Sequence, residues 1–217
     1  VPPSEVGSFT LKRVDRGLAV VVGVGSLVMG LQSLLAALGP DMTRPGWNLA
    51  VMTMVFVPLA LMVIACLLRW RVRWFAAVFA IVYPLALLLW PLTLTETPRS
   101  GAEPWILDLI NVATVAAVVA FSFPLQIVWT IGVPIEYAVV RLVQAGFSPD
   151  AWIAVGLDVT FALILGAILM TISWLFRAVA VEVDASRMAA VESFSRAAVV
   201  DAVEKERVAV AALMHDS

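Results

Sequence analysis

Five polar side chains lie within long apolar runs, where an ionisable or amide group is expensive to desolvate. They are Asp108, Asn111, Glu136, Arg141 and Asp158. Helical counting places all five on the outer side of the predicted membrane or near its midplane. Such groups either pair across helices to hold the packing or line a ligand or ion site, and both alternatives stay open here. Arg141 is expected to pair with Asp108 or Asp158, because five residues separate it from Glu136 by about 140° around a helix.

A histidine and an aspartate stand side by side near the end of the sequence, at His215 and Asp216. His215 is the sole histidine and Cys66 the sole cysteine, which excludes an intrachain disulfide, a thiolate-rich metal site and a His-rich metal or haem site. An imidazole on a solvent-facing helix can attack a phosphoryl group, and an adjacent carboxylate can hold the proton of its other nitrogen. Whether His215 and Asp216 serve in phosphoryl transfer must be judged from the residues that flank them.

The composition indicates that a membrane protein positions these residues. Of 217 residues, 62% are apolar and 14% are charged, whereas a soluble domain has about half and a quarter. The net charge of −2 disfavours a nucleic-acid partner. Six apolar runs come close to the roughly 20 residues that cross a bilayer as a helix. They lie at 17–38, 49–68, 73–91, 105–122, 126–145 and 152–176. The sequence therefore predicts an all-α polytopic membrane protein with six transmembrane helices.

Basic residues and tryptophans indicate how these helices are oriented. One side carries Lys12, Arg13, Arg16, Arg69, Arg71, Arg73 and Arg177, and the other carries Arg44, Arg99 and Arg141. Because cytoplasmic loops hold the excess of basic residues, both termini are predicted to be cytoplasmic in a multi-pass cell-membrane protein. All eight tryptophans fall at or near the predicted ends of the runs, as expected of indole rings in the headgroup region.

Glycines and prolines inside the runs suggest details of helix packing. Pro58, Pro84, Pro91 and Pro134 lie in or near predicted helices and are expected to bend them, which is common in membrane helices. The segment Gly23-Val24-Gly25-Ser26 has no strand before it, so close helix packing is expected rather than phosphate binding. Cys66 is expected to be a packing residue.

The chain changes character after residue 176. Residues 1–176 hold 18 charged side chains, and the remaining 41 residues hold 12. No proline follows Pro149 and no glycine follows Gly166, so the sixth helix is predicted to continue as a long cytoplasmic helix. Part of its apolar residues fit a heptad spacing, which favours a parallel coiled-coil homodimer. This seam consists of Met188, Val191, Ala198 and Ala202.

The last twelve residues are Glu206-Arg207-Val208-Ala209-Val210-Ala211-Ala212-Leu213-Met214-His215-Asp216-Ser217. This segment resembles the H-box of bacterial sensor histidine kinases, in the family whose dimerisation helix has the pattern E-R-x-R-I-A-R-E-L-H-D. The matching positions are Glu206, Arg207, Ala211, His215 and Asp216. Val210 and Met214 replace the pattern's Ile and Leu. Ala209 replaces its second arginine, and Ala212-Leu213 replace its Arg-Glu pair.

The resemblance implies the membrane sensor and signal-transmitting part of a two-component sensor histidine kinase, with His215 as phosphoacceptor and Asp216 as general base. Family members continue into an ATP-binding domain, so ATP and Mg²⁺ are expected there and no cofactor or metal is expected in this chain. The chain is then an enzyme fragment, inactive alone, that reaches a response regulator through the full-length kinase. Its expected parts are a cytoplasmic segment 1–16, a membrane sensor domain 17–176, a signalling helix 177–205 and the start of the phosphoacceptor helix 206–217.

A small polytopic transporter or channel subunit with a cytoplasmic coiled coil is the alternative. In that case the polar residues of the outer half would line a substrate path, and further polar residues should continue it to the cytoplasm. The inner half of the runs has no comparable charges, which disfavours this alternative.

Overall fold

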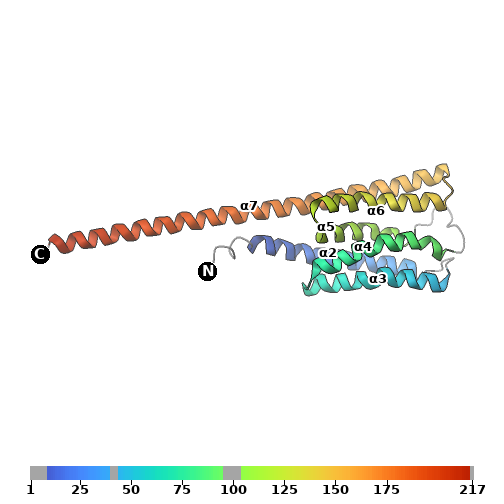
Figure 1. The fold of residues 1–217 in the computed structure, drawn as a ribbon, viewed down its shortest axis with the longest axis horizontal. Coiled ribbons are helices and arrows are strands. Elements are labelled where there is room, and N and C mark those ends of the chain that lie inside the picture. The colour runs from blue at the N-terminus through green and yellow to red at the C-terminus, as the bar shows by residue number, and fades with distance from the viewer. Residues whose placement is uncertain (1–8, 40–43, 95–103, 216–217) are drawn as a thin grey trace. The chain divides into compact units, whose positions relative to one another are not determined.

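The computed structural model describes residues 9–39, 44–94 and 104–215, and every element assigned in them is a helix (Figure 1). The elements are α2 (Phe9–Ala37), α3 (Pro45–Leu68), α4 (Val72–Leu89), the 3₁₀ helices η1 (Trp90–Thr93) and η2 (Leu107–Leu109), α5 (Ile110–Ala120), α6 (Phe123–Gln144) and α7 (Pro149–His215). The chain forms two units, Arg16–Trp174 and a smaller one of Val1–Asp15 with Leu175–Ser217. The predicted all-α class is confirmed.

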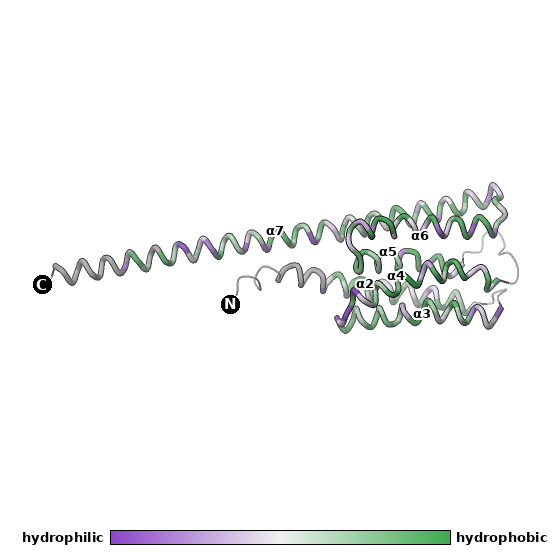
Figure 2. The backbone as a smooth tube through the Cα atoms, viewed as in Figure 1, coloured by the Kyte–Doolittle hydropathy of each residue, from purple (hydrophilic) through white to green (hydrophobic). Residues whose placement is uncertain are grey.

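Apolar helices long enough to span a membrane make up most of the larger unit, as the colouring in Figure 2 shows. Among the described residues there are five: Arg16–Ala37, Gly46–Leu68, Val72–Thr93, Phe123–Gln144 and Pro149–Val199. They correspond to five of the six predicted runs. The fourth run forms the shorter apolar helix Leu107–Ala120 instead. Membrane character is therefore supported, whereas the count of six spans and the orientation of the termini stay predictions.

Helix α5 is short and lies inside the larger unit. Eight of its 11 residues are buried, and α4 and α6 pack along it. A helix that is apolar on all faces is expected to be enclosed in this way. Its 11 residues rise only roughly 16 Å, about half the thickness of a hydrocarbon core. The backbone beyond its ends must therefore find hydrogen-bond partners within the protein.

At the N-terminal end of α5, two hydroxyl groups bind the backbone of the segment that leads into it. The Ser33 hydroxyl on α2 donates to the carbonyl oxygen of Trp105, at 2.7 Å. The Tyr83 hydroxyl on α4 donates to the carbonyl oxygen of Ile106, at 2.6 Å. Both hydroxyl-bearing side chains are fully buried. The Ile106 carbonyl also accepts from the N–H of Leu109, at 3.3 Å, so the Tyr83 hydroxyl is its second donor. The two side-chain bonds therefore attach the segment before α5 to α2 and α4.

At the C-terminal end of α5, an amide and a guanidinium group perform the same task. The side-chain amide of Gln126 donates to the carbonyl oxygens of Val118 and Phe121, both at 2.9 Å. The guanidinium of Arg73 donates to the carbonyl oxygen of Ala120, at 3.3 Å. A cation there also complements the negative end of the helix dipole.

The connections from α3 to α4 and from α6 to α7 are tight. Arg69 and Arg71 have φ of 57° and 47° and turn the chain between α3 and α4. The Arg71 guanidinium lies 5.7 Å from the centre of the Trp70 ring, within range of a cation–π interaction. Gly146 and Phe147 have φ of 67° and 56° between α6 and α7.

Helix α2 approaches α3 most closely at two glycines spaced seven residues apart. A Cβ atom at Gly23 would lie 2.8 Å from the Cβ of Cys66, and one at Gly30 would lie 2.7 Å from a terminal methyl of Leu59. The predicted close packing is thus confirmed at Gly23, and buried Cys66 is a packing residue. The same prediction is wrong for Gly25, where an added Cβ meets no atom within 4 Å.

Some of the tryptophans are buried within the protein, so their side chains contact other residues rather than the surrounding headgroup region. Trp90 and Trp105 are only 2% and 4% exposed, and Trp105 stacks on Phe56 with ring centres 5.5 Å apart. The indole N–H of Trp129 donates to the carbonyl oxygen of Ala80 in α4, at 2.9 Å. That carbonyl lies four residues before Pro84, which has no N–H to offer it. Trp129 therefore replaces the helical hydrogen bond that the proline removes.

Because the Trp129 N–H takes the place of the N–H that Pro84 lacks, the effects of mutating Trp129 and Pro84 on stability should be coupled. Trp129→Phe should lower the free energy of unfolding by about 1 kcal/mol, because the Ala80 carbonyl loses its buried donor. In a Pro84→Ala background the loss should be much smaller, because residue 84 then donates to Ala80. Thermal unfolding of the four proteins in one detergent, followed by circular dichroism, measures the coupling. Equal losses in the two backgrounds would contradict it.

Candidate functional site

Four of the five polar residues predicted to form an intramembrane site gather around two tyrosines. Tyr83 on α4 and Tyr137 on α6 are both fully buried. We call the group formed by these two tyrosines with Asp108, Glu136, Arg141 and Asp158 the tyrosine cluster. Its charged members are partly buried. The helices α4, α6 and α7 and the turn η2 each contribute at least one residue.

Tyr137 links the two charged residues that the sequence suggested as a pair. Its hydroxyl donates to a carboxylate oxygen of Asp158 on α7, at 3.2 Å. The side chain of Arg141, one helical turn further along α6, lies within hydrogen-bonding range of the same hydroxyl. The anticipated association of Arg141 with Asp158 thus runs through a phenol. In this arrangement the position of Asp158, and with it α7, depends on a chain of hydrogen bonds from α6.

Tyr83 connects the other acidic residues to the entrance of α5. Its hydroxyl, bound to the Ile106 carbonyl, lies within electrostatic range of Glu136, Asp108 and Tyr137. Asp108 occupies the first turn of η2, where a carboxylate complements the positive end of a helix. The cluster is therefore continuous with the hydrogen bonds that hold α5 in place.

Two polar atoms of the tyrosine cluster are buried without a partner in the part of the chain that the structure describes. They are Oε1 of Glu136 and Nε of Arg141. Leaving a buried polar atom unpaired costs about 1–3 kcal/mol. The two atoms belong to side chains about 140° apart around α6, so each needs a partner of its own, an acceptor for Nε and a donor for Oε1. A ligand site would use these unpaired hydrogen-bonding atoms, whereas residues that serve only helix packing would not need them.

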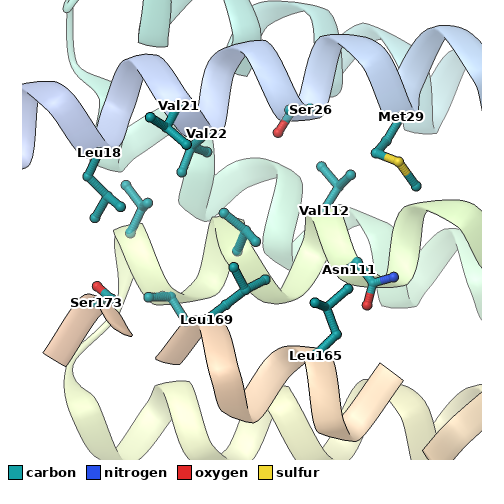
Figure 3. A pocket seen from close by; sticks show the side chains of 14 residues that line it. Leu18, Val21, Val22, Ser26, Met29, Asn111, Val112, Leu165, Leu169 and Ser173 are labelled. Atoms are coloured by element: carbon teal, nitrogen blue, oxygen red, sulfur yellow. The ribbon is translucent and has the colours of Figure 1, made fainter. Parts of the chain in front are cut away.

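Asn111, the fifth predicted residue, lines a separate cavity. The cavity lies between α2, α5 and α7 and has a volume of about 290 Å³. Figure 3 shows Asn111 near Leu165 at one end of it and Ser173 beyond Leu169 at the other. The structure therefore divides the predicted site into a charged cluster and a mainly apolar cavity.

The predicted phosphoacceptor residues are only partly covered by the structure. His215 is the last residue of α7, but its side chain lies outside the described residues, as does all of Asp216. The predicted unbroken helix is confirmed, because α7 runs from Pro149 to His215. In the smaller unit, Met188 and Val191 of the predicted seam are 43% and 61% exposed. Their pairing in a coiled coil stays a prediction.

Sequence reasoning missed Tyr83, Tyr137 and Gln126. The rarity of tyrosine was a usable signal, since the chain has only these two tyrosines. Tyr137 follows Glu136 directly. It precedes Arg141 by four residues, so the side chains of Tyr137 and Arg141 share a helix face. Gln126 lacked such a signal, because its partners are backbone carbonyls at a helix end that the sequence did not locate.

Comparison with known proteins assigns no family. No protein-family model matches the chain, and neither a curated protein nor a solved structure matches it. In the described residues, no group of three or more His, Cys, Asp or Glu side chains could hold a metal ion. The function of the chain is therefore inferred from its residues and their geometry.

The hydrogen bonds of Tyr137 predict how the cluster contributes to stability. Tyr137→Phe should lower the free energy of unfolding by about 1 kcal/mol, because Asp158 and Arg141 lose the group that joins them. Asp158→Asn should have a smaller effect in the Tyr137→Phe background than in the original protein. Unfolding titrations with SDS in mixed micelles measure both. Fully additive effects would show that the two side chains do not interact.

Proposed function

We propose that this chain is the membrane sensor and signal-transmitting part of a two-component sensor histidine kinase. It relays a stimulus from the membrane or its outer face to autophosphorylation at His215. The observation that carries this proposal is the H-box-like segment at the end of α7, a helix that also contributes Asp158 to the tyrosine cluster. One continuous element thus contains a candidate input residue and the candidate phosphoacceptor.

The packing around α7 supports a role in signal transmission. A Cβ atom at Gly166 would lie 2.7 Å from a methyl of Thr130 on α6 and 3.2 Å from a methyl of Thr114 on α5. A glycine contact has no side chain that locks into a neighbouring groove, so it opposes rotation or sliding only weakly. Asp158 lies eight residues before this contact. A stimulus that changes the partners of Asp158 moves α7 by such a rotation or shift.

The chemistry at the other end follows from the imidazole. A ring nitrogen of His215 attacks the γ-phosphorus of ATP, the N–P bond forms, and the bond to the ADP oxygen breaks. Asp216 holds the proton of the other ring nitrogen and so raises the nucleophilicity of the first. An ATP-binding domain of the family's kind supplies ATP and Mg²⁺. A response regulator then receives the phosphoryl group from His215.

The proposal includes a location and an oligomeric state. The chain is a multi-pass cell-membrane protein with cytoplasmic termini, and it forms a homodimer through α7. The exposed apolar residues of the smaller unit, among them Val181, Met188 and Val191, provide a surface for that pairing. A helix cannot bury such residues alone, which is why a second copy is required.

The phosphoacceptor assignment predicts the outcome of a labelling experiment. The gene is expressed together with the reading frame that follows codon 217. The resulting protein is purified, placed in nanodiscs and incubated with radiolabelled ATP and Mg²⁺. Acid-labile, alkali-stable label should appear, and His215→Gln should abolish it. Asp216→Asn should slow labelling about 100-fold, the lower end of what a general base contributes. Equal labelling of His215→Gln and the original protein would overturn the proposal.

The sensing role of the tyrosine cluster predicts a change in kinase rate. In the same nanodisc assay, Glu136→Ala and Asp158→Ala should each change the labelling rate at least about fivefold, the lower range of allosteric coupling. Asp150→Ala serves as the control, because Asp150 is an exposed carboxylate on the same helix. Rates that stay within twofold for both cluster variants would leave the cluster with a packing role alone.

A further inference from the structure

The cavity between α2, α5 and α7 is built from residues of three helices that are far apart in the sequence. Leu18, Val22 and Met29 line it from α2, Val112 and Val115 from α5, and Leu165 and Leu169 from α7 (Figure 3). All of them belong to the larger unit. The lining is almost entirely aliphatic, and its contacts to an occupant would therefore be dispersive and hydrophobic.

The volume of the cavity sets the size of an occupant. An apolar cavity of 150 Å³ holds one benzene molecule, so 290 Å³ has space for about 8 to 12 non-hydrogen atoms. Val21 lines the cavity and is 70% exposed, so the cavity opens on the apolar surface of α2. A molecule dissolved in the bilayer can enter there without crossing water.

Polar atoms in the lining restrict the chemistry of the occupant. Ser173 is 3% exposed, and its hydroxyl oxygen has no hydrogen-bond partner in the described residues. Oδ1 of Asn111 is likewise buried without a partner. Both atoms are already shielded from water by the protein, and a purely hydrocarbon occupant would leave them unpaired. An occupant with a hydroxyl group offers a partner to the Asn111 side chain when that side chain turns toward the cavity, because a hydroxyl both donates and accepts, as a carboxamide does.

We propose that this cavity is a binding site for a small apolar alcohol from the bilayer, with an aliphatic body of about eight to ten carbons and its hydroxyl on Asn111. The occupant contacts α2, α5 and α7 at once. Binding does not require that the chain belong to a kinase. An effect of binding on His215 would rest on the proposed function, and the two are tested separately.

The test is photolabelling of the complete chain in nanodiscs with an eight-carbon alcohol that carries a diazirine group. Peptide mass spectrometry should locate saturable adducts on the lining segments of α2, α5 and α7, and 1-decanol should displace the probe. Adducts spread evenly over the exposed apolar faces, without saturation, would overturn the proposal.

Filling the cavity from either side should abolish the saturable labelling. Leu169→Trp fills it from α7, and Gly25→Leu fills it from α2, where an added Cβ meets no atom within 4 Å. The matched control is Ile168→Trp, since Ile168 is 48% exposed and does not line the cavity. Circular dichroism and gel filtration confirm that each variant is folded. Labelling that persists in folded Gly25→Leu would overturn the proposal independently of Leu169→Trp.

The hydroxyl contact is tested by competition. Asn111→Leu should weaken displacement by 1-decanol about fivefold, the effect of one hydrogen bond, and leave displacement by decane unchanged. In the original protein, 1-decanol should compete better than decane by a similar factor. Equal competition by the two molecules would show that the cavity holds hydrocarbon only, and the proposed alcohol specificity would then be wrong.

Discussion

The arrangement of this bundle depends on the backbone hydrogen bonds at the two ends of α5. In an apolar environment an unpaired backbone group has no water to bind, so the carbonyl groups at the end of a helix, and those of the turn that leads into it, need donors within the protein. Ser33 and Tyr83 supply donors at one end, and Gln126 and Arg73 supply them at the other. These donors come from α2, α4 and α6, so the register of three helices is set against one short central helix.

This constraint separates the polar residues of the larger unit into two groups. Members of the first group, such as Gln126 and Trp129, donate to carbonyl groups that a helix end or a proline leaves unpaired, and their role is complete. Members of the second group have a polar atom that is buried without a partner among the described residues, as Glu136 has at Oε1 and Arg141 at Nε. Tyr83 belongs to both, because its hydroxyl binds the Ile106 carbonyl and faces the acidic residues. The second group is where a function beyond packing is to be sought.

Much of the fold follows from the sequence, because apolar runs and their polar breaks depend on local chemistry. The turns at Arg69–Arg71 and at Gly146 and the unbroken helix up to His215 were all predictable from nearby residues. The shortness of α5 was predictable at one end only, because Pro124 and extended Ser122 mark its C-terminal end, whereas the apolar run continues past its N-terminal end. Likewise the charged members of the tyrosine cluster were evident in the runs, whereas the phenol that joins Asp158 to Arg141 depends on which faces of α6 and α7 meet. The cavity depends on three such faces and leaves no local signal.

Helix α7 contributes residues to both candidate sites, on either side of one close contact. Asp158 meets Tyr137 eight residues before Gly166, and Ser173 lines the cavity seven residues after it. A helix of this length is stiff, so a rotation or shift that begins on one side of the Gly166 contact continues to the other side. On the proposed function, a change at the tyrosine cluster and an occupant in the cavity would therefore bias the same movement of α7. The two sites would then be coupled through the helix even without direct contact, because each ligand alters the free energy of the same two positions of α7.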